Sequence, residues 1–367
     1  MTEAAFMERA LVLARRGLGR TAPNPAVGCV LVREGQIIGE GWHQKAGGPH
    51  AEVHAIAAAG DATGATAYVT LEPCNFTGRT GPCTEALIAA GVSRVVAASL
   101  DPNPKVAGGG LKRLEAVGIE TRFGLCGPAG DRLIGPFRHW ILNKRPEVTL
   151  KVATSLDGRI ATSTGHSQWV TGEPARLDGH QLRNQLDAIM VGSGTVIADN
   201  PRLTTRLPEG GRNPTRIVVS ASLAMPADSA LFTPPLTTRT IVVTTAVSGQ
   251  IRSAKADVLR TRGVEIIEVD GDQSVDLLDA MTRLAKLSIT SVLVEGGRGL
   301  LTSLLNARLC DRMVCYVAPC VVGDDGLGWA GPLGIRSMNH AIRLANVESR
   351  TLGTDMRMEG DCVYGNH

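Results

Sequence analysis

The chain is poor in aromatic residues, nearly balanced in charge and without long hydrophobic runs. Phe, Trp and Tyr make up 3% of its 367 residues, which leaves few rings on which single-stranded bases could stack. The 38 Lys and Arg residues against 35 Asp and Glu residues give a formal net charge of +3. Because that charge is too small to attract a polyanion in bulk, we expect no nucleic-acid partner.

No apolar run approaches the roughly 18 residues that a membrane helix needs, and Met1–Ala4 does not begin a secretory signal. We therefore expect a cytoplasmic protein without a membrane partner. Eight cysteines are too few for a disulfide scaffold and are expected to be thiols, some of them able to bind a metal. Cys310, Cys315 and Cys320 have no histidine beside them and are expected to be small buried thiols.

The shares of hydrophobic residues (43%) and charged residues (20%) are near the average for globular proteins. The length suggests about two domains. Hydrophobic periodicity predicts an α/β fold in each half, with a boundary in the Gly- and Pro-rich segment 124–147. In the first half we expect helices at 4–16, 50–59, 85–90 and 111–117, and strands at 27–33, 36–41, 67–71, 94–99 and 119–123. In the second half we expect helices at 174–185, at 277–287 and after Gly297, and strands at 148–153, 188–192, 216–220, 241–245, 264–269, 291–294 and 312–318.

One histidine and two cysteines have the pattern of a zinc site with an open position. His50 and Glu52 begin a predicted helix, Cys74 follows a strand, and Cys83 follows a Gly- and Pro-rich loop. One imidazole and two thiolates can hold Zn²⁺ and leave a fourth position for water, whose pKa the metal lowers to about 7. Glu52 is placed to carry protons without binding the metal. This is the zinc-deaminase pattern H-x-E with P-C-x-x-C, except that eight residues separate the cysteines.

Several motifs in the same order resemble the bifunctional deaminase-reductases of riboflavin biosynthesis. These are the segments 23–29, 48–52, 73–83 and 101–104 in the first half, and 149–161, 167–169, 192–206 and 294–297 in the second. The resemblance implies a cytidine-deaminase-like three-layer domain over residues 1–145 and a dihydrofolate-reductase-like domain over residues 146–367. It also implies one Zn²⁺ per chain, NADPH as the second cofactor and a small phosphoribosyl pyrimidine substrate.

The same resemblance assigns roles to residues of the first half. Water is expected to replace an exocyclic amine of 2,5-diamino-6-(5-phosphoribosylamino)pyrimidin-4-one, giving 5-amino-6-(5-phosphoribosylamino)uracil and ammonia. The residues implied to bind this substrate are Asn24, His43, Arg79 and Asp101. Asn24 and Asp101 precede proline and are equally readable as turn residues. Phe76 stands where the family usually has histidine, which removes a hydrogen-bonding group but none of the metal ligands.

In the second half, a strand followed by Gly296-Gly297 and a helix is typical of a phosphate cradle. The first strand lacks the Gly-x-Gly-x-x-Gly pattern that follows it in ordinary dinucleotide-binding domains. By resemblance, hydride from NADPH reduces the ribosyl group to ribityl. The implied cofactor contacts are Ala153, Trp169, Thr195, Asp199 and Gly297. The implied substrate contacts are Ser167, Arg183, Leu203, Arg206 and Glu295.

The sequence leaves the roles of Asp157, Lys151 and Ser220 open. Asp157 and Lys151 fit either a role near the nicotinamide or a structural one. Ser220 replaces an acidic residue that the family often has, which leaves that cofactor contact unsettled. The alternatives are a paralogue with a decayed site and a nucleic-acid base deaminase, and a homo-oligomer (dimer or tetramer) is left open.

Overall fold

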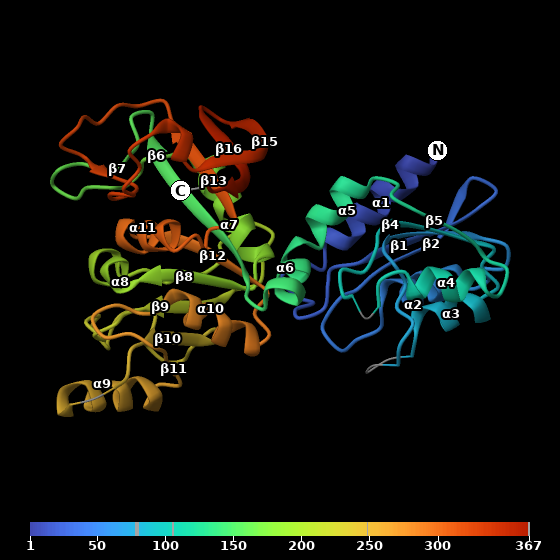
Figure 1. The fold of residues 1–367 in the computed structure, drawn as a ribbon, viewed down its shortest axis with the longest axis horizontal. Helices are drawn as coiled ribbons and strands as arrows, with labels where there is room; N and C mark the ends of the chain where they lie inside the picture. Colours follow the sequence, from blue (N-terminus) through green and yellow to red (C-terminus); the bar gives the residue numbers. More distant parts are fainter. Residues whose placement is uncertain (78–80, 105, 248, 366–367) are drawn as a thin grey trace. The chain divides into compact units, whose positions relative to one another are not determined.

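The computed structural model describes residues 1–77, 81–104, 106–247 and 249–365. Its chain divides into two units, Met1–Arg145 and Pro146–His367, and each has its own sheet and helices (Figure 1).

A five-stranded sheet of order β2-β1-β3-β4-β5 forms the middle of the first unit. The hairpin β1–β2 and the pair β1–β3 are antiparallel, whereas β3, β4 and β5 run parallel. All five strands lie where the sequence predicts them. Their bounds are β1 (Gly28–Arg33), β2 (Gln36–Trp42), β3 (Thr66–Leu71), β4 (Arg94–Ser99) and β5 (Glu120–Phe123).

Helices cover both faces of this sheet, because alternate strand residues point to opposite sides. Val30 and Val32 pack with α1 and α5, while Cys29 and Leu31 pack with α2, α3 and α4. The result is a three-layer arrangement. The helices are α1 (Glu3–Arg15), α2 (Ala51–Ala59), α3 (Cys83–Ala89), α4 (Gly109–Glu115), α5 (Gly127–Leu133) and α6 (Gly135–Asn143).

Helices α5 and α6 lie in the segment that sequence reasoning treated only as an interruption. Each begins with a Gly-Pro pair, which places Pro128 and Pro136 in the first turn. A proline there costs no hydrogen bond, since the first-turn N–H groups have no partner within the helix. Gly-Pro therefore marks two helix starts here rather than a loop.

The close approach of α2 to the hairpin depends on a glycine. A Cβ atom at Gly41 of β2 would lie 2.3 Å from the carbonyl oxygen of Ala51. No side chain fits in that space, so glycine lets the first turn of α2 rest directly on the strand. His50 caps that turn, and its position is thereby set by the hairpin.

The carboxylate of Glu72, at the end of β3, organises the loop that leads into α4. Glu72 is buried. Its Oε2 accepts the backbone N–H groups of Asp101 (3.2 Å) and Gly108 (2.8 Å), and its Oε1 accepts those of Gly110 (2.8 Å) and Leu111 (3.3 Å). One side chain thus joins the Pro73-Cys74 segment to the loop that carries Asp101.

The second unit is built on a nine-stranded sheet of order β11-β10-β9-β8-β12-β6-β13-β16-β15. The pairs from β11 to β13 are parallel, and β16 and β15 are added antiparallel. The short strands β7 and β14 pair apart from it. The bounds are β6 (Glu147–Ser155), β7 (Arg159–Ala161), β8 (Ala188–Gly192), β9 (Thr215–Val219), β10 (Thr240–Thr244), β11 (Glu265–Glu268), β12 (Ser291–Gly296), β13 (Arg312–Ala318), β14 (Leu327–Gly328), β15 (Arg343–Leu352) and β16 (Asp355–Val363).

Helices again pack on both faces of the sheet. Met190 of β8 lies in the core with α10 and α11, while Ile189 and Val191 of the same strand lie in the core with α8 and α9. Of these elements, α8, α9, β7 and β14–β16 were not predicted from the sequence. The helices are α7 (Glu173–Gln185), α8 (Ser193–Asp199), α9 (Gln250–Thr261), α10 (Leu277–Lys286) and α11 (Arg298–Asn306), with a 3-10 turn at Met338–His340.

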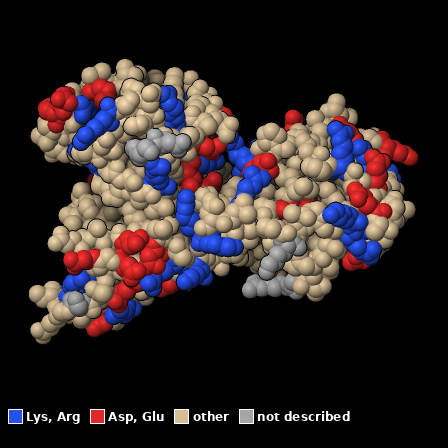
Figure 2. All heavy atoms as spheres, in the orientation of Figure 1, with Lys and Arg blue, Asp and Glu red and all other residues tan. Residues whose placement is uncertain are grey.

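The surface carries both signs of charge. On the face drawn in Figure 2, Lys and Arg side chains lie next to Asp and Glu side chains on each unit, in keeping with the net charge of +3. Within the described residues, no helix has both the length and the apolar character needed to cross a membrane.

The Glu72 network generates a stability prediction. We expect Glu72→Gln to lower the thermal unfolding midpoint of the first unit, because an amide presents an NH₂ group to backbone donors that need acceptors. Leaving buried N–H groups unsatisfied costs about 1–3 kcal/mol each. Calorimetry of the full chain tests this, with Glu34→Gln at an exposed turn position as the matched control. An unchanged midpoint in Glu72→Gln would contradict the network's role.

Candidate functional site

Three elements bring His50, Cys74 and Cys83 together in the first unit. His50 is the N-cap of α2, Cys74 follows β3, and Cys83 is the first residue of α3. Their ligand atoms all lie within 4.8 Å of one another. The eight-residue gap between the cysteines is therefore closed by the return of the chain to the start of α3.

The spacing of these atoms fits a zinc ion. His50 Nδ1 is 3.1 Å from Cys83 Sγ and 3.6 Å from Cys74 Sγ. Tetrahedral Zn–N and Zn–S bonds place such donors about 3.6 Å apart. The backbone N–H of Cys83 donates to Cys74 Sγ at 3.4 Å, a contact that favours the thiolate. Hydrogen bonds from Cys83 and His50 lower the pKa of Cys74 to about 4, so a thiolate is available to the metal.

Glu52 lies in the first turn of α2, two residues after the histidine ligand. Its side chain is buried, and burial raises its pKa above the ordinary value. The charge of Cys74 raises this pKa further, whereas His50 and a hydrogen bond with Cys83 oppose the rise. A carboxyl group beside the metal donors, itself outside the donor set, is the arrangement needed for proton transfer.

His43 and Asn24 form a second polar pair next to the metal donors. His43 is buried, and its ring meets the ring of His50 edge-on with centroids 5.2 Å apart. His43 Nδ1 lies 2.9 Å from the carbonyl oxygen of Pro49. A carbonyl only accepts, so Nδ1 carries the proton and Nε2 is free to accept from Asn24 Nδ2 at 3.3 Å. Burial lowers the pKa of His43, which favours the neutral ring.

Asp101 and Arg79 are the other two residues of this unit that the sequence predicted to bind substrate, and Phe76 is its departure from the family pattern. Asp101 is half-buried, and its Oδ1 accepts the backbone N–H of Asn103 at 2.8 Å, a turn contact that agrees with the alternative reading. Burial raises the pKa of Asp101, and the nearby Glu72 and Cys74 act in the same direction. Arg79 lies outside the described residues. Phe76 is exposed.

A cavity of about 630 Å³ opens at the carboxyl edge of the parallel strands in the second unit. Its walls come from the ends of β8, β9 and β12, from β7 and from the first turn of α11. Ligands in open α/β sheets bind at this edge. The sequence-predicted residues that line it are Ser167, Thr195, Asp199, Glu295 and Gly297.

The turn from β12 into α11 approaches α8 closely in this cavity. A Cβ atom at Gly297 would lie 3.1 Å from Thr195 Oγ1, so a side chain there would crowd the hydroxyl group. Gly297 is the N-cap of α11, and Arg298 and Gly299 of the first turn also line the cavity. Unpaired N–H groups of a helix start therefore face a space able to take an anionic ligand.

Next to the cavity, a charged cluster surrounds Glu295. Arg183 of α7 forms a two-point ion pair with it, through Nε (2.6 Å) and Nη2 (2.7 Å). Burial alone raises the pKa of Glu295, but Arg183, Lys151 and His180 together lower it to about 2. Burial, Arg183 and Arg206 lower the pKa of His180 to about 4. His180 is therefore neutral at pH 7, and the guanidinium groups of Arg183 and Arg206 face the carboxylate of Glu295.

Five sequence-predicted residues lie outside the lining of the cavity: Arg183 and Arg206 of the charged cluster, and Trp169, Ala153 and Leu203. Trp169 is exposed, and the guanidinium of Arg176 lies 4.6 Å from its ring centre. Ala153 packs beside Tyr316 within the sheet. Leu203 has its side chain in the core, which leaves only its backbone for contact with a ligand.

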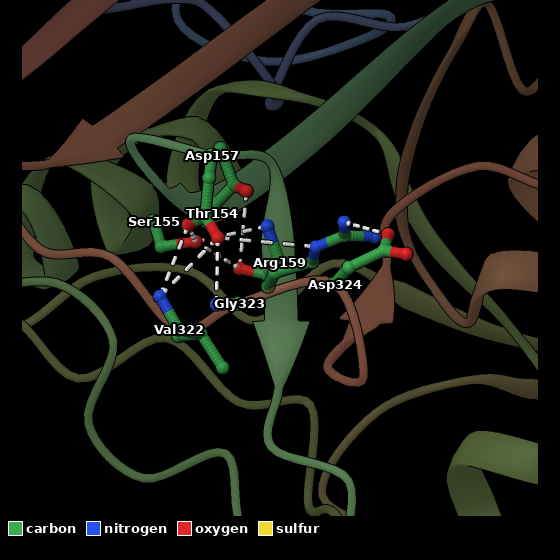
Figure 3. A network of polar contacts seen from close by, with 7 residues as sticks. All are labelled: Thr154, Ser155, Asp157, Arg159, Val322, Gly323 and Asp324. Atoms are coloured by element: carbon green, nitrogen blue, oxygen red, sulfur yellow. Dashed lines mark hydrogen bonds and ion pairs between the residues drawn. The ribbon is translucent and has the colours of Figure 1, made fainter.

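Asp157 holds one wall of the cavity in place (Figure 3). It accepts the hydroxyl of Ser155 (2.6 Å) and the backbone N–H of Gly323 (2.8 Å). The hydrogen bond from Ser155 is the main cause that lowers the pKa of Asp157 to about 2. The loop anchored in this way continues into β14, whose Leu327 lines the cavity. The structural reading of Asp157 is thus the one that the geometry supports.

Ser220 is buried, and its hydroxyl accepts the backbone N–H of Ala224 at 3.2 Å; its neighbours Val219 and Ala221 line the cavity. Cys310 is buried, Cys315 half-buried and Cys320 exposed. The expectation of a buried thiol was therefore wrong for Cys320, which follows the end of β13.

Sequence reasoning missed Glu72 and His180. Glu72 directly precedes the Pro73-Cys74 motif, and its position at a strand end was the available signal. His180 lies three residues before Arg183 and therefore on the same face of α7. Its Nδ1 lies 3.4 Å from the backbone nitrogen of Arg206. Nothing in the spacing of the sequence indicated that long-range contact.

Comparison with known proteins covers both units. Residues 1–99 match the cytidine and deoxycytidylate deaminase zinc-binding region, and residues 146–358 match the RibD C-terminal domain. Riboflavin biosynthesis protein RibD of Actinobacillus pleuropneumoniae is 42% identical over 362 residues, which are 98% of this chain and 95% of that protein. The Escherichia coli protein of the same name is 41% identical, over 97% of this chain and 98% of its own.

Solved structures of the same family also match nearly the whole chain. Acinetobacter baumannii RibD superposes with a TM-score of 0.85 at 38% identity, covering 98% of each chain. A Thermotoga maritima diaminohydroxyphosphoribosylaminopyrimidine deaminase/5-amino-6-(5-phosphoribosylamino)uracil reductase gives 0.84 at 35% identity, again over 98% of each chain. The fold class expected from the sequence is confirmed. The chain belongs to the RibD family, the bifunctional zinc-dependent deaminases and NADPH-dependent reductases of riboflavin biosynthesis.

Proposed function

We propose that residues 1–145 deaminate 2,5-diamino-6-(5-phosphoribosylamino)pyrimidin-4-one to 5-amino-6-(5-phosphoribosylamino)uracil. Residues 146–367 then reduce the ribosyl group of that product to ribityl with NADPH. The observation that carries the proposal is the convergence of His50, Cys74 and Cys83 beside the buried Glu52. The printed name of the Thermotoga maritima relative, which states both reactions, supports the choice of substrate.

In the first unit, His50, Cys74 and Cys83 would hold the zinc ion. A zinc ion with three protein ligands supplies a water nucleophile at neutral pH. Glu52 would accept a proton at its carboxylate and pass it to the departing amine. Its burial keeps bulk water away from the transfer, and its place on the same helical turn as His50 keeps its distance from the metal donors constant.

Asn24 and His43 hold the pyrimidine next to this centre. The Pro49 carbonyl fixes the orientation of the His43 ring, so its Nε2 presents an acceptor to Asn24 or to a substrate N–H. Asp101, held by its bond to the Asn103 N–H, offers a second acceptor, and Arg79 supplies a guanidinium for the phosphate. The exposed Phe76 leaves the three metal donors in place, which favours an active site over a decayed one.

In the second unit, the cavity at the carboxyl edge would hold NADPH, and Gly297, Thr195 and Asp199 of its lining would contact the cofactor. Ser167 also lines this cavity and would contact the substrate. The nicotinamide supplies hydride to C1 of the sugar in its open imine form. Ala153, Trp169 and the backbone at Leu203 complete the contacts with the two ligands.

The phosphate of the substrate is bound by the charged cluster. The guanidinium groups of Arg183 and Arg206 exceed the single charge of Glu295, so the cluster keeps a positive charge for the phosphate. Lys151 lies beside them, and burial lowers its pKa. The ion pair with Glu295 holds the Arg183 guanidinium in a fixed orientation. His180 stays neutral at physiological pH, since its pKa is about 4, and adds no further positive charge.

We also propose that the enzyme acts in the cytoplasm on this small molecule without a nucleic-acid partner. The described cysteines are free thiols, which suits a reducing compartment. A homo-oligomer remains a prediction of the sequence.

Glu52→Gln tests the deaminase assignment. We expect the variant to retain zinc but to release ammonia at least about 100-fold more slowly, since general acid–base catalysis contributes roughly 10²–10⁴-fold. Reduction of the deaminated substrate should continue at the normal rate. A coupled assay that follows ammonia and NADPH together on purified protein, with zinc content by atomic absorption, measures all three. Ammonia release at the normal rate would contradict the role of Glu52.

Arg206→Ala tests the reductase assignment. Loss of a hydrogen bond to a charged group costs about 1.5–3 kcal/mol, so we expect kcat/KM for NADPH oxidation to fall about 10- to 100-fold, with deamination unchanged. Arg206→Lys should recover part of this loss, because the charge remains while the guanidinium fork is absent. Arg260→Ala, in α9 and paired with Asp257, is the matched control. Loss of ammonia release in Arg206→Ala would argue against two separate sites.

A further inference from the structure

Two cysteine sulfurs of the second unit lie beside each other and outside the sites described above. Cys310 and Cys362 are 52 positions apart in the chain, yet their Sγ atoms are 3.2 Å apart. Cys310 lies between α11 and β13, and Cys362 lies in β16. Cys310 is buried and Cys362 is half-buried, so the pair can be approached from the side of Cys362.

The backbone holds these two residues in register. The N–H of Cys362 donates to the carbonyl of Asp311 at 2.8 Å. The hydroxyl of Tyr364 accepts the N–H of Cys310 at 3.1 Å and donates to its carbonyl at 3.0 Å. Asp311 in turn exchanges hydrogen bonds with the backbone of Val148, at 2.8 and 2.9 Å. The backbone at both cysteines is therefore held by the sheet, at positions from which the two side chains meet.

We propose that Cys310 and Cys362 are a redox-active dithiol, which a low-molecular-weight disulfide oxidises to an intramolecular disulfide. The Cys362 thiolate attacks one sulfur of the small disulfide, forms a mixed disulfide and releases one small thiolate. Cys310 then loses its proton and attacks the sulfur of Cys362, which releases the second small thiolate. Two protein thiols lose two electrons and two protons, and the small disulfide is reduced to two thiols.

The surroundings set the order of these steps. Cys310 Sγ lies 3.2 Å from the carbonyl oxygen of Arg312, so its S–H has an acceptor as well as its partner sulfur. The hydrogen bond with Cys362 and burial raise the pKa of Cys310. Cys310 therefore keeps its proton until the mixed disulfide forms next to it, and the more accessible Cys362 reacts first.

A metal-binding role is not supported for this pair. The cluster of metal-ligating side chains found among the described residues is His50, Cys74 and Cys83, and it lies in the other unit. Two thiols without a third donor suit covalent closure better than coordination.

The dithiol lies at the end of the sheet opposite to the cavity. Asp311 contacts Val148 near the amino end of β6, whereas the cavity is lined by Gly192, Glu295 and Gly297. These residues lie at or just past the carboxyl ends of β8 and β12, and β12 runs parallel to β6. A crosslink would tie β16 to the segment before β13 and leave the cavity open. Oxidation is thus expected to stabilise the second unit and to spare reduction.

Oxidation of the zinc-loaded full chain tests this. The protein is incubated with glutathione disulfide, free thiols are blocked with N-ethylmaleimide, and a non-reducing digest is mapped by mass spectrometry. We expect one linked peptide pair that contains Cys310 and Cys362, two hydrogens lighter than the separate peptides and reversed by dithiothreitol. The unfolding midpoint of the second unit should rise by several degrees, with NADPH oxidation unchanged.

Two variants make the result decisive. Cys362→Ser should give neither the linked peptide nor the rise in midpoint, whereas Cys320→Ser, which removes an exposed thiol of the same unit, should keep both. Blocked thiols at Cys310 and Cys362, or glutathione left on Cys362, in a sample whose Cys320 has reacted would overturn the proposal. Loss of NADPH oxidation on crosslinking would also overturn it, because the cavity would then not be independent of the dithiol.

Discussion

The geometry of the first unit depends on the meeting of two helix starts with one strand end. His50 caps α2, Cys83 begins α3, and Cys74 follows β3. Buried packing fixes each element: α2 rests on the hairpin at Gly41, and α3 contributes Leu87 to the same core. Because two of the ligands lie at helix starts and the third lies just past a strand, their atoms converge closely enough to hold a tetrahedral metal ion with an open position.

Carboxylates recur as organisers throughout the chain, and each owes its role to its surroundings. Glu72 gathers backbone N–H groups and shapes a loop. Asp157 does the same for a wall of the cavity. Glu295 instead pairs with a guanidinium and moderates a cationic cluster, while Glu52 is buried without such a pair and is suited to proton transfer. A carboxylate therefore anchors a loop, pairs with a cation or carries a proton, depending on the groups that surround it.

In both units, candidate site residues lie at helix starts, where backbone N–H groups have no partner within the helix. The starts of α2 and α3 carry metal donors, and the start of α11 presents N–H groups to the cavity. Glycine and proline permit these junctions: Gly41 and Gly297 by removing a side chain, and Pro128 and Pro136 by beginning helices without losing a hydrogen bond. The Gly-Pro pairs show how one local signal can mark either a loop or a helix start, and at Pro128 the packing of α5 against the sheet decides between them.

Periodicity and short motifs in the sequence determined the α/β class, nearly all strands of the two parallel cores, and the residues of the metal cluster, because these depend on neighbours within one element. Tertiary structure alone decided that Asp157 is a loop anchor, that Leu203 points into the core, that His180 lies against Arg206, and that Cys310 meets Cys362. Those contacts join residues distant in the chain, and no local pattern carries information about which distant partner a side chain will meet. The antiparallel strands β15 and β16 escaped prediction for a related reason: alternate polar residues on an exposed sheet edge lack the hydrophobic signal that marks a buried strand.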